Sequence, residues 1–547
     1  MDHHHISSLL CHQMIQGAYA NLNQHADEVN DLNVFPIPDG DTGSNMLLTV
    51  QGGAQTLPQP DEPLGAYARR AADGMLLSAR GNSGVILSQF ADGVAAGLEG
   101  SDQADAEALS KAFLLGVEHA YAAVVEAVEG TILTVMREAS EYAVTRPHDT
   151  IDAYLFDFLD RARTSLKNTP ELLDVLKKAH VVDSGGAGLI YIVEGAAAAL
   201  NGEEHTAYEA PAAPAPHSEL NLDLFDEDSE LTFGYCTELL LRLQRAKTDI
   251  KSFDVTVIRD FLQAVGDSIV CFQNGSIVKI HVHTKEPYRV LEFCQKYGEY
   301  LTVKIENMSL QHNNLPSDSP QTEQQERKKY GVVAVASGEG MKQTFREMGA
   351  DQIIEGGQSM NPSTDDFIEA FDQVNADTIF VLPNNGNVIL AAEQAAKLYE
   401  NADVRVIESK TIGDCYAILT MLDMDCGSAD DIVTQMNDAM QGVITASVSR
   451  CVRSTQMDGF QLEEGQYIGF VGKEILSADN DRYDTACMLA DKVDFTDREV
   501  CILVRGLDSD EKEAEEIAQH IRRSHTGCEV YVINGDQDIY SYILIAE

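Results

Sequence analysis

The chain has 547 residues and a formal net charge of −49, because 88 acidic side chains outnumber 39 basic ones. One hydrophobic core does not organise a chain of this length, so we expect three or more domains. The excess of negative charge, without a basic cluster, argues against nucleic acid and anionic lipid surfaces as partners. Ten scattered cysteines without a Cys-x-x-Cys pair argue against a disulfide framework. We expect a cytoplasmic protein without a secretory signal or a transmembrane segment.

The first 200 residues are rich in Ala, Leu and Glu, which favours helices. Apolar residues recur there at helical spacing, at Leu10, Met14, Ala18 and Leu22. We therefore predict an all-α domain over residues 1–205. A Pro/Ala stretch and an acidic stretch follow it, and we assign residues 206–230 as a linker.

Residues 33–46 form the most informative segment, Asn-Val-Phe-Pro-Ile-Pro-Asp-Gly-Asp-Thr-Gly-Ser-Asn-Met. Two prolines hold its approach extended, and Gly40 permits a turn that aims Asp39 and Asp41 at one centre. Carboxylates of this kind suit Mg²⁺, which prefers oxygen ligands and nucleotide phosphates. We expect a helix to open at Ser44 and to aim free N–H groups at an anion. The simpler alternative is an acidic turn that caps a helix.

Three further segments are candidates for phosphate or nucleoside contact. Their small, glycine-rich character permits close backbone approach to a ligand, although an ordinary turn is the favoured interpretation of the first and the third segment taken alone. The candidate residues are Arg80, Gly81, Asn82, Ser83 and Gly84, then Gly130 and Thr131, then Asp183 and Gly185. No Gly-x-x-x-x-Gly-Lys-Ser/Thr string occurs, so the site is not a P-loop.

From residue 231 the composition changes to alternating strands and helices. We predict strands over 231–243, 268–272, 276–284 and 301–307, and helices over 253–265 and 287–297. Asn274-Gly275 is a strong hairpin signal between the second and third strands. The order β-α-β-β-α-β predicts a ferredoxin-like α+β domain over residues 231–312. A polar linker over 313–329 follows.

His281 and His283 share one face of the predicted third strand, because the apolar residues between and before them take the other face. Cys236 lies on the predicted first strand, which a ferredoxin-like sheet places beside the third. A cysteine with two histidines suits Zn²⁺. From the residues alone, a polar sheet face without metal is the favoured interpretation.

The C-terminal part, residues 330–547, again alternates strands with helices, which predicts an α/β domain with a parallel sheet. Its strands are expected at 331–336, 378–382, 404–407, 500–505 and 529–533. Loops at 356–364 and 382–385 follow strands and are candidate binding loops. Helix capping also accounts for them, by Asn361 or Ser363 before one helix and by Asn384 or Asn385 before the next.

These motifs resemble a known family. The string from Asp39 to Met46 resembles the metal-binding loop in the nucleotide-binding domain of dihydroxyacetone kinases. With its lead-in it resembles more closely the catalytic subunit of bacterial fatty acid kinase. The Ile-Val-Lys-Ile-His-Val-His-Thr segment and the C-terminal loops extend the resemblance to essentially the whole chain. In the kinases of glycerone a third aspartate precedes the pair; here that position is Val34, and Asn33 or Asp31 would have to serve.

The resemblance implies an N-terminal helical barrel that binds ATP and Mg²⁺, with Asp39, Asp41 and Asn33 on the metal. It also implies nucleotide contacts at the glycine-rich segments and at Thr42, Gly43, Ser44 and Asn45, and Zn²⁺ at Cys236, His281 and His283. The implied reaction is phosphorylation of a fatty acid carboxylate, presented by a separate fatty-acid-binding protein, to acyl-phosphate for phospholipid synthesis. A homodimer is implied, with the C-terminal domain used for docking or dimerisation.

Two alternatives remain at this point. The first is a kinase of a small polyol or ketone such as glycerone, although no substrate-holding histidine domain is apparent. The second is a non-catalytic protein that senses nucleotide. A carboxylate acceptor fits the lack of an obvious general base near the metal loop, because a fatty acid is already ionised at neutral pH.

Overall fold

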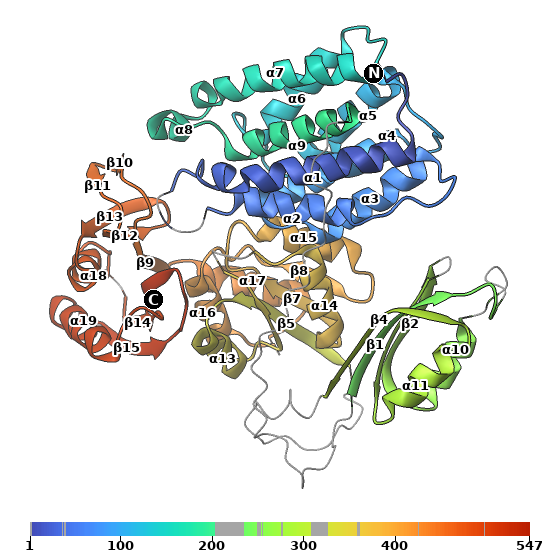
Figure 1. Ribbon diagram of the computed structural model, residues 1–547. Coiled ribbons are helices and arrows are strands. Elements are labelled where there is room, and N and C mark those ends of the chain that lie inside the picture. The colour runs from blue at the N-terminus through green and yellow to red at the C-terminus, as the bar shows by residue number, and fades with distance from the viewer. Residues whose placement is uncertain are drawn as a thin grey trace. The chain divides into compact units, whose positions relative to one another are not determined.

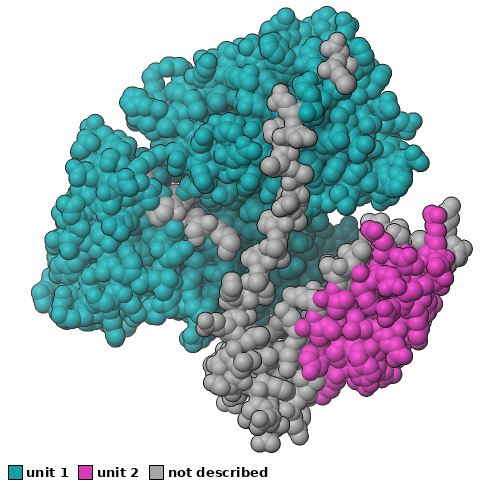
Figure 2. Space-filling model, in the orientation of Figure 1, with its two compact units in different colours: residues 1–209, 326–547 teal, residues 210–325 magenta. Residues whose placement is uncertain are grey.

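The computed structural model describes residues 3–35, 37, 40–202, 235–248, 253, 255–274, 277–307, 327–357, 361–424, 426–496 and 498–547. The chain divides into two compact units, residues 1–209 with 326–547 and residues 210–325 (Figure 2). The predicted linker 206–230 lies outside the described residues, as does most of the linker 313–329. The end of the second predicted linker already belongs to a strand, which begins at Lys328.

The N-terminal part is a set of packed helices, which confirms the predicted helical domain (Figure 1). Each helix buries one face in a common apolar core. Where α1 and α9 cross, a Cβ on Gly17 would lie 2.4 Å from the carbonyl oxygen of Gly195, so glycine permits the close contact. The helices are α1 Ser8–Asn30, α2 Thr42–Ala54, α3 Leu64–Ser78, α4 Gly81–Gly97, α5 Ala106–Ala122, α6 Ile132–Val144, α7 Ile151–Leu172, α8 Asp174–Ala179 and α9 Ser184–Leu200.

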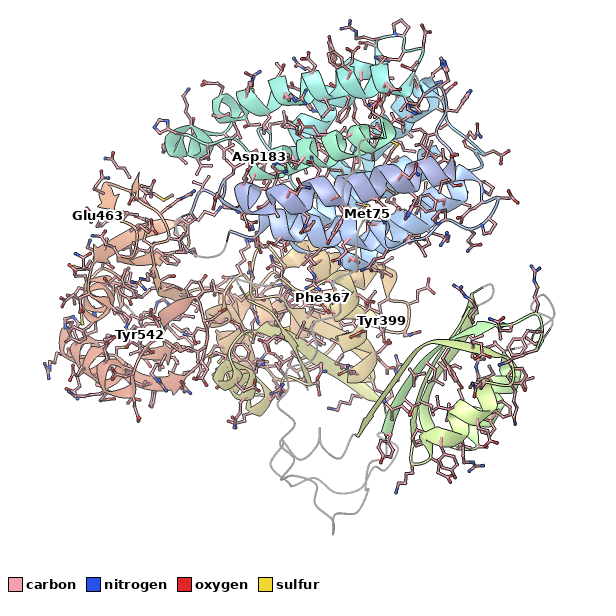
Figure 3. All side chains as sticks on the ribbon, in the orientation of Figure 1. Met75, Asp183, Phe367, Tyr399, Glu463 and Tyr542 are labelled. Atoms are coloured by element: carbon pink, nitrogen blue, oxygen red, sulfur yellow. The ribbon has the colours of Figure 1, made fainter. Side chains whose placement is uncertain are left out.

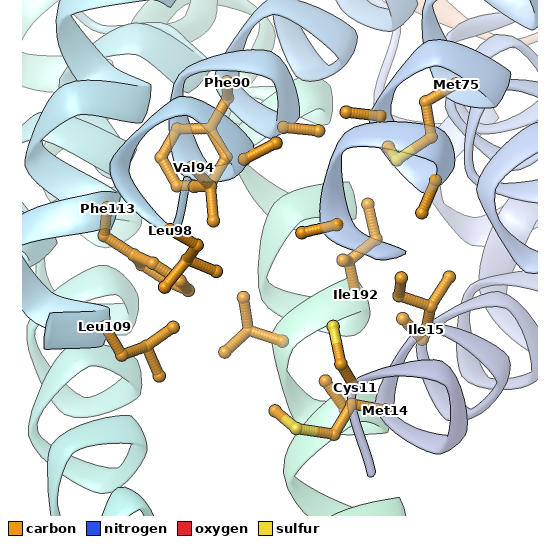
Figure 4. A pocket seen from close by; sticks show the side chains of 18 of the residues that line it. Cys11, Met14, Ile15, Met75, Phe90, Val94, Leu98, Leu109, Phe113 and Ile192 are labelled. Carbon is orange, nitrogen blue, oxygen red and sulfur yellow. The ribbon is translucent and has the colours of Figure 1, made fainter. Parts of the chain in front are cut away.

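An apolar cavity of about 190 Å³ lies inside this helical core (Figure 4). Its wall is formed by aliphatic, aromatic and sulfur-containing side chains such as Met14, Met75, Phe90 and Phe113. None of the predicted site residues lines it. With this lining the cavity offers no charged group to orient a phosphate, so it does not coincide with the predicted nucleotide site.

The second unit carries an antiparallel sheet with strand order β2-β3-β1-β4. The buried residues Val278, Ile280 and Val282 form its core face, as predicted, together with residues of the helices. The described residues at the β2–β3 connection fit a hairpin, although Gly275 and Ser276 lie outside them. The elements are β1 Tyr235–Leu243, α10 Thr256–Gln263, β2 Asp267–Asn274, β3 Ile277–Thr284, α11 Pro287–Cys294 and β4 Gly298–Asn307.

Residues from 328 onward begin with a parallel sheet of order β6-β5-β7-β8, as the alternating pattern predicts. Apolar side chains project from both faces of β5 and β7, and helices pack against each face. The elements are β5 Lys328–Ala336, α13 Glu339–Glu347, β6 Gln352–Glu355, α14 Thr364–Val374, β7 Ala376–Leu382, α15 Ile389–Leu398, β8 Asp403–Val406, α16 Ile412–Met421 and α17 Ala429–Met440.

The remaining residues form a mixed sheet of order β13-β12-β9-β16-β14-β15, which corrects the expectation of a parallel sheet throughout. Only β14 and β15 pair in parallel among its described strands, because hairpin and long return connections join the others. A small hairpin, β10 with β11, lies beside it. The elements are β9 Ile444–Arg450, β10 Thr455–Met457, β11 Phe460–Leu462, β12 Tyr467–Val471, β13 Glu474–Asp479, α18 Arg482–Ala490, β14 Val500–Arg505, α19 Glu511–Ser524, β15 Glu529–Asn534 and β16 Tyr540–Ala546.

The capping predictions are confirmed at one helix and wrong at the other. Ser363 caps α14 in a capping box, where its Oγ accepts from the N–H of Asp366 at 3.1 Å. Helix α15 follows Val388 without a side-chain cap. Asn384 is buried instead and donates to the carbonyl of Val335 at 2.7 Å. Asn384 therefore ties two strand ends together rather than starting a helix.

The helical domain and the C-terminal part share a hydrophobic core within the first unit. Ala79 and Val85, at the start of α4, pack in the cluster that covers one face of the parallel sheet. Helix α15 contacts α4 and α14 contacts α3, which makes this boundary a packed interface. Within the described part of the chain the cysteines are free thiols, and no helix has the length and apolarity to cross a membrane.

Candidate functional site

The loop between α1 and α2 carries the predicted metal carboxylates. Asp39 lies outside the described residues, and Asp41 directly precedes α2. The helix opens at Thr42, not at Ser44. The Oδ1 atom of Asn30 accepts hydrogen bonds from the N–H groups of Gly43 at 2.7 Å and Ser44 at 3.3 Å. The expectation that these N–H groups are free is therefore wrong: a side chain at the end of α1 already satisfies them.

Asn33 uses its side-chain amide to hold this loop closed. Its Nδ2 donates to the carbonyl of Asn30 at 2.9 Å, and its Oδ1 accepts from the hydroxyl of Thr42 at 2.9 Å. Thr42 Oγ1 also accepts from the hydroxyl of Ser184, which opens α9. A role for Asn33 as a metal ligand stays a prediction, and its oxygen would have to release Thr42.

Asp41 is half-buried among amide groups from two distant parts of the chain. Asn45, one turn along α2, and Asn361, from the loop before α14, both direct side-chain hydrogen bonds to its carboxylate. Burial raises the pKa of Asp41 to about 6, and these two hydrogen bonds oppose the rise. A carboxylate removed from water in this way is stabilised by a cation.

The second predicted segment, Arg80 to Gly84, opens α4 beside the amides that contact this carboxylate. Gly81 has a φ of +57°, and a Cβ there would lie 2.5 Å from Nδ2 of Asn45 and 3.2 Å from Nδ2 of Asn361. A Cβ on Gly84 would lie 2.4 Å from the hydroxyl of Thr49. Both glycines are therefore required for α4 to approach α2 at this point.

Arg80 contacts the C-terminal part. Its guanidinium donates to the carbonyl of Asn361 at 2.7 Å and pairs with the carboxylate of Asp366 at 3.4 Å. Its backbone also forms a bridge with Ser363. A phosphate contact of Arg80 stays a prediction. In the structure Arg80 stabilises the loop that carries Asn361.

The three glycine-rich segments meet at one cleft of about 560 Å³. This volume lies in the range of small-molecule sites, roughly 300–1,000 Å³. Asp183 caps α9 by accepting from the N–H of Gly186 at 2.7 Å (Figure 3). Gly130 has a φ of +86° and donates its N–H to Thr134 beside the cleft wall. The predicted residues that line the cleft are Asn82, Ser83, Thr131, Asp183 and Gly185.

The opposite wall of this cleft comes from the C-terminal part, which the sequence did not indicate. Lys410 supplies the basic side chain among the described lining residues, while Glu393 and Glu408 are acidic. Asn82 donates from Nδ2 to Asn387 across the cleft at 3.4 Å. The other lining residues on that wall are Gly386, Ile389 and Leu390. No local motif marks these positions, because only the fold brings them to the nucleotide segments.

The C-terminal part also contacts the loop between α1 and α2 through Arg453 and through a small apolar core. The guanidinium of Arg453 donates to the carbonyls of Asp31, at 3.0 Å, and of Asn33 and Val34. The ring of Phe35 packs edge-on against Phe470, with centroids 5.1 Å apart. Ile37, which is 4% exposed, is buried in the small core beside β12 and β13: Cys451, Leu462, Ile468, Phe470 and Ile475.

In the second unit, the predicted zinc ligands lie on facing positions of two neighbouring strands. Cys236 pairs with His283 across β1 and β3, and Glu238 pairs with His281. Directly paired positions share one face of a sheet, as do positions two apart. The side chains of these residues lie outside the described part, within which no cluster of three metal-ligating side chains is found.

Replacing Arg453 tests whether its hydrogen bonds hold the loop between α1 and α2 in position. Arg453→Met removes the donors to three loop carbonyls, so the carboxylates lose their fixed position, and we expect kcat/KM for ATP to fall about tenfold or more. Arg450→Met is the matched control, because Arg450 is exposed on β9 and donates to Gly465. The measurement is steady-state ATP turnover, with circular dichroism melts to verify folding. Equal activity in the two variants would contradict this role.

Replacing Asp183 tests its buried charge. Burial raises the pKa of Asp183 to about 6, above its value in the unfolded chain. The ionised carboxylate therefore lowers the free energy of unfolding above about pH 6. This loss of stability disappears below about pH 4, where the group is protonated in both states. Asp183→Asn keeps an oxygen acceptor for Gly186. We expect its Tm to exceed that of the wild type at pH 7.5, by the equivalent of roughly 3 kcal/mol at most, and the gap to close towards pH 4. Scanning calorimetry measures the two Tm values. A difference in Tm that does not change with pH would refute the raised pKa of Asp183.

Three family models match the chain in succession. They are a DAK2 domain over residues 36–198, a FakA-like middle domain over 232–315 and a FakA-like C-terminal domain over 331–547, the last two named for fatty acid kinase. Protein YloV of Bacillus subtilis (strain 168) is 38% identical over 98% of both chains. An uncharacterized protein of Staphylococcus aureus (strain USA300) is 36% identical, again over 98% of both.

Two solved structures show local similarity. One is dihydroxyacetone kinase from C. freundii in complex with AMP-PNP and Mg²⁺, with 20% identity over 36% of this chain and 35% of that one and a TM-score of 0.29. The other is DegV, a fatty acid binding protein from Bacillus subtilis, with 13% identity over 40% and 99% and a TM-score of 0.30. The successive family matches and the relatives that align along the whole chain show that this protein belongs to the FakA-like family of fatty acid kinase proteins.

Proposed function

We propose that this chain is an ATP-dependent kinase that phosphorylates the carboxylate of a fatty acid presented by a separate fatty-acid-binding protein. The observation that carries the proposal is the meeting of three glycine-rich segments at one cleft. One of these segments, at the start of α4, also packs against Asn45 and Asn361, whose amides hydrogen-bond to the carboxylate of Asp41. Family membership supports the kinase class. The product would be an acyl-phosphate, a precursor suited to phospholipid synthesis in the cytoplasm.

Asp39 and Asp41 would hold Mg²⁺, whose charge supports binding of the ATP phosphates and the transfer of the γ-phosphoryl group. The residues fit this cation, because Asp41 is a half-buried carboxylate that accepts hydrogen bonds from the amides of Asn45 and Asn361. Lys410 adds a positive charge on the opposite wall of the cleft. These local charges matter because the chain as a whole, at −49, repels a polyanion.

A fatty acid carboxylate needs no general base, since it is ionised at neutral pH. What it needs is neutralisation of the phosphate charge and exclusion of water, because an acyl-phosphate hydrolyses readily. The C-terminal part already covers one side of the cleft. We propose that the fatty-acid-binding protein docks over the remaining opening, and that the chain acts as a homodimer.

We also propose the ferredoxin-like class for the middle domain, on the strand order β2-β3-β1-β4, and Zn²⁺ at Cys236, His281 and His283. The register that pairs Cys236 with His283 supports the second proposal, and the donor set suits zinc. Its role is separate from phosphoryl transfer.

The central test measures ATP turnover with Mg²⁺ and oleate, with and without a purified bacterial fatty-acid-binding protein, and traps the product with hydroxylamine. We expect partner-dependent hydroxamate. Asp41→Asn should lower its formation at least a hundredfold, since a metal ligand is lost, whereas the exposed Asp73→Asn should leave it within twofold. Turnover with glycerone alone would indicate a polyol kinase, and no turnover at all would indicate a nucleotide sensor.

For the zinc site we expect one bound Zn²⁺ per chain of the protein purified without chelator. Cys236→Ser should lose most of it, because a thiolate is replaced by a weak ligand. Elemental analysis by mass spectrometry measures the metal, with Cys426→Ser, an exposed free cysteine, as the control. Unchanged zinc in Cys236→Ser, or none in the wild type, would refute the site.

A further inference from the structure

We propose that Asn361, from the C-terminal part, is an oxygen ligand of the cation at Asp41. The inference rests on the proposed metal–nucleotide function and adds to it a ligand that comes from outside the helical domain. It would make the metal centre a joint product of two parts of the chain, more than 300 residues apart in sequence.

The contact itself is the first observation. The Nδ2 atom of Asn361 donates to Oδ2 of Asp41. Asn361 is 1% exposed, so its side chain is removed from water and aimed at the carboxylate. Its Oδ1 atom is buried too, and no donor among the described residues reaches it. A buried amide oxygen without a partner costs free energy and calls for an explanation.

A cation explains this arrangement. Against a bare carboxylate the NH₂ group must face Asp41, because an amide oxygen would repel the carboxylate. With a divalent cation on the carboxylate the preference reverses, since a carbonyl oxygen of Asn is a good ligand for a hard cation. A half-turn about the Cβ–Cγ bond of Asn361 exchanges oxygen and nitrogen without moving the backbone. The oxygen then gains the partner that it lacks.

The backbone of Asn361 is fixed in the way that a ligand requires. Arg80 donates to its carbonyl oxygen and is itself paired with Asp366. Ser363, two residues on, starts α14 in a capping box. Gly81 leaves the space in which the amides of Asn361 and Asn45 meet. This support preorganises the position before any metal arrives.

Asn361 also suits the role of a third ligand better than the candidates nearer in sequence do. The position of a third aspartate falls on Val34, which has no ligand atom in its side chain. The amide of Asn33 is engaged at both ends, with Asn30 and Thr42. Asp31 is exposed, whereas Asp41 is mostly buried. Asn361 already touches the metal carboxylate.

The test is Mn²⁺ binding to the full chain, followed by electron paramagnetic resonance, with Mn²⁺ as the probe for Mg²⁺. Asn361→Ala should weaken binding about tenfold or more. Gln394→Leu is the matched control, because Gln394 is also buried and also donates across the interface, to the carbonyl of Leu76 at 2.8 Å, away from Asp41. We expect the control to bind within twofold of the wild type. Equal affinity in Asn361→Ala and Gln394→Leu would overturn the proposal.

A second variant distinguishes the loss of a metal ligand from the loss of packing that Asn361→Ala also causes. Asn361→Asp places two carboxylates against each other, so its Tm without metal should fall below that of the wild type. Added Mg²⁺ should then raise its Tm by more than it raises the wild type's, because the variant offers the cation an extra charged ligand. An equal or smaller Mg²⁺ response would contradict coordination. If the wild type itself bound no Mn²⁺, the proposed function would fail instead, which is a distinct result.

Discussion

The site depends on one constraint: the loop that carries Asp41 is held by contacts from the C-terminal part of the chain. Arg453 satisfies the loop carbonyls, Phe35 and Ile37 bury their side chains in a core beside the mixed sheet, and Asn361 contacts the carboxylate. Pro36 and Pro38 in this loop have no N–H to donate, so contacts from the C-terminal part add to the hydrogen bonds that Asn30 and Asn33 make. Its geometry is therefore a property of the first unit as a whole.

The same interface shapes the cleft. Helix α4 brings Asn82 and Ser83 to one wall, and α15 with residues 408–410 forms the other. Because Ala79 and Val85 pack in the core of the parallel sheet, the start of α4 cannot shift without disturbing that core. Arg80 holds the backbone of Asn361, and Asn361 donates to Asp41, so the same interface also restrains this carboxylate. The C-terminal part thus forms one wall of the cleft and supplies a contact to the carboxylate of Asp41.

Sequence patterns predicted the elements whose periodicity is local. The helices before residue 200 and the buried strands β5 and β7 follow from spacing of apolar residues, and Ser363 follows from capping chemistry. The glycine-rich segments at Asn82, Thr131 and Asp183 were recognisable because a ligand requires small residues where a backbone approaches it. The fold brings residues of these segments to one cleft, and their contact with a nucleotide stays a prediction.

The sequence did not reveal the contacts between residues that lie far apart in the chain. Nothing around Asn361 distinguishes a metal contact from a helix cap, and Lys410 resembles any exposed lysine until the fold brings it to the cleft. The free N–H groups expected at Gly43 and Ser44 are occupied by Asn30, which has no motif of its own. The antiparallel strands β9 and β13 were missed because polar residues interrupt their apolar ones, and β10 and β11 because they have three residues each.

The most direct test of this joint site is a crystal structure of the full chain with Mg²⁺ and a non-hydrolysable ATP analogue. We expect the phosphates between the start of α4 and the wall formed by α15 and Lys410, with the cation bound to Asp41. A nucleotide bound elsewhere, or a cation bound without Asp41, would contradict it.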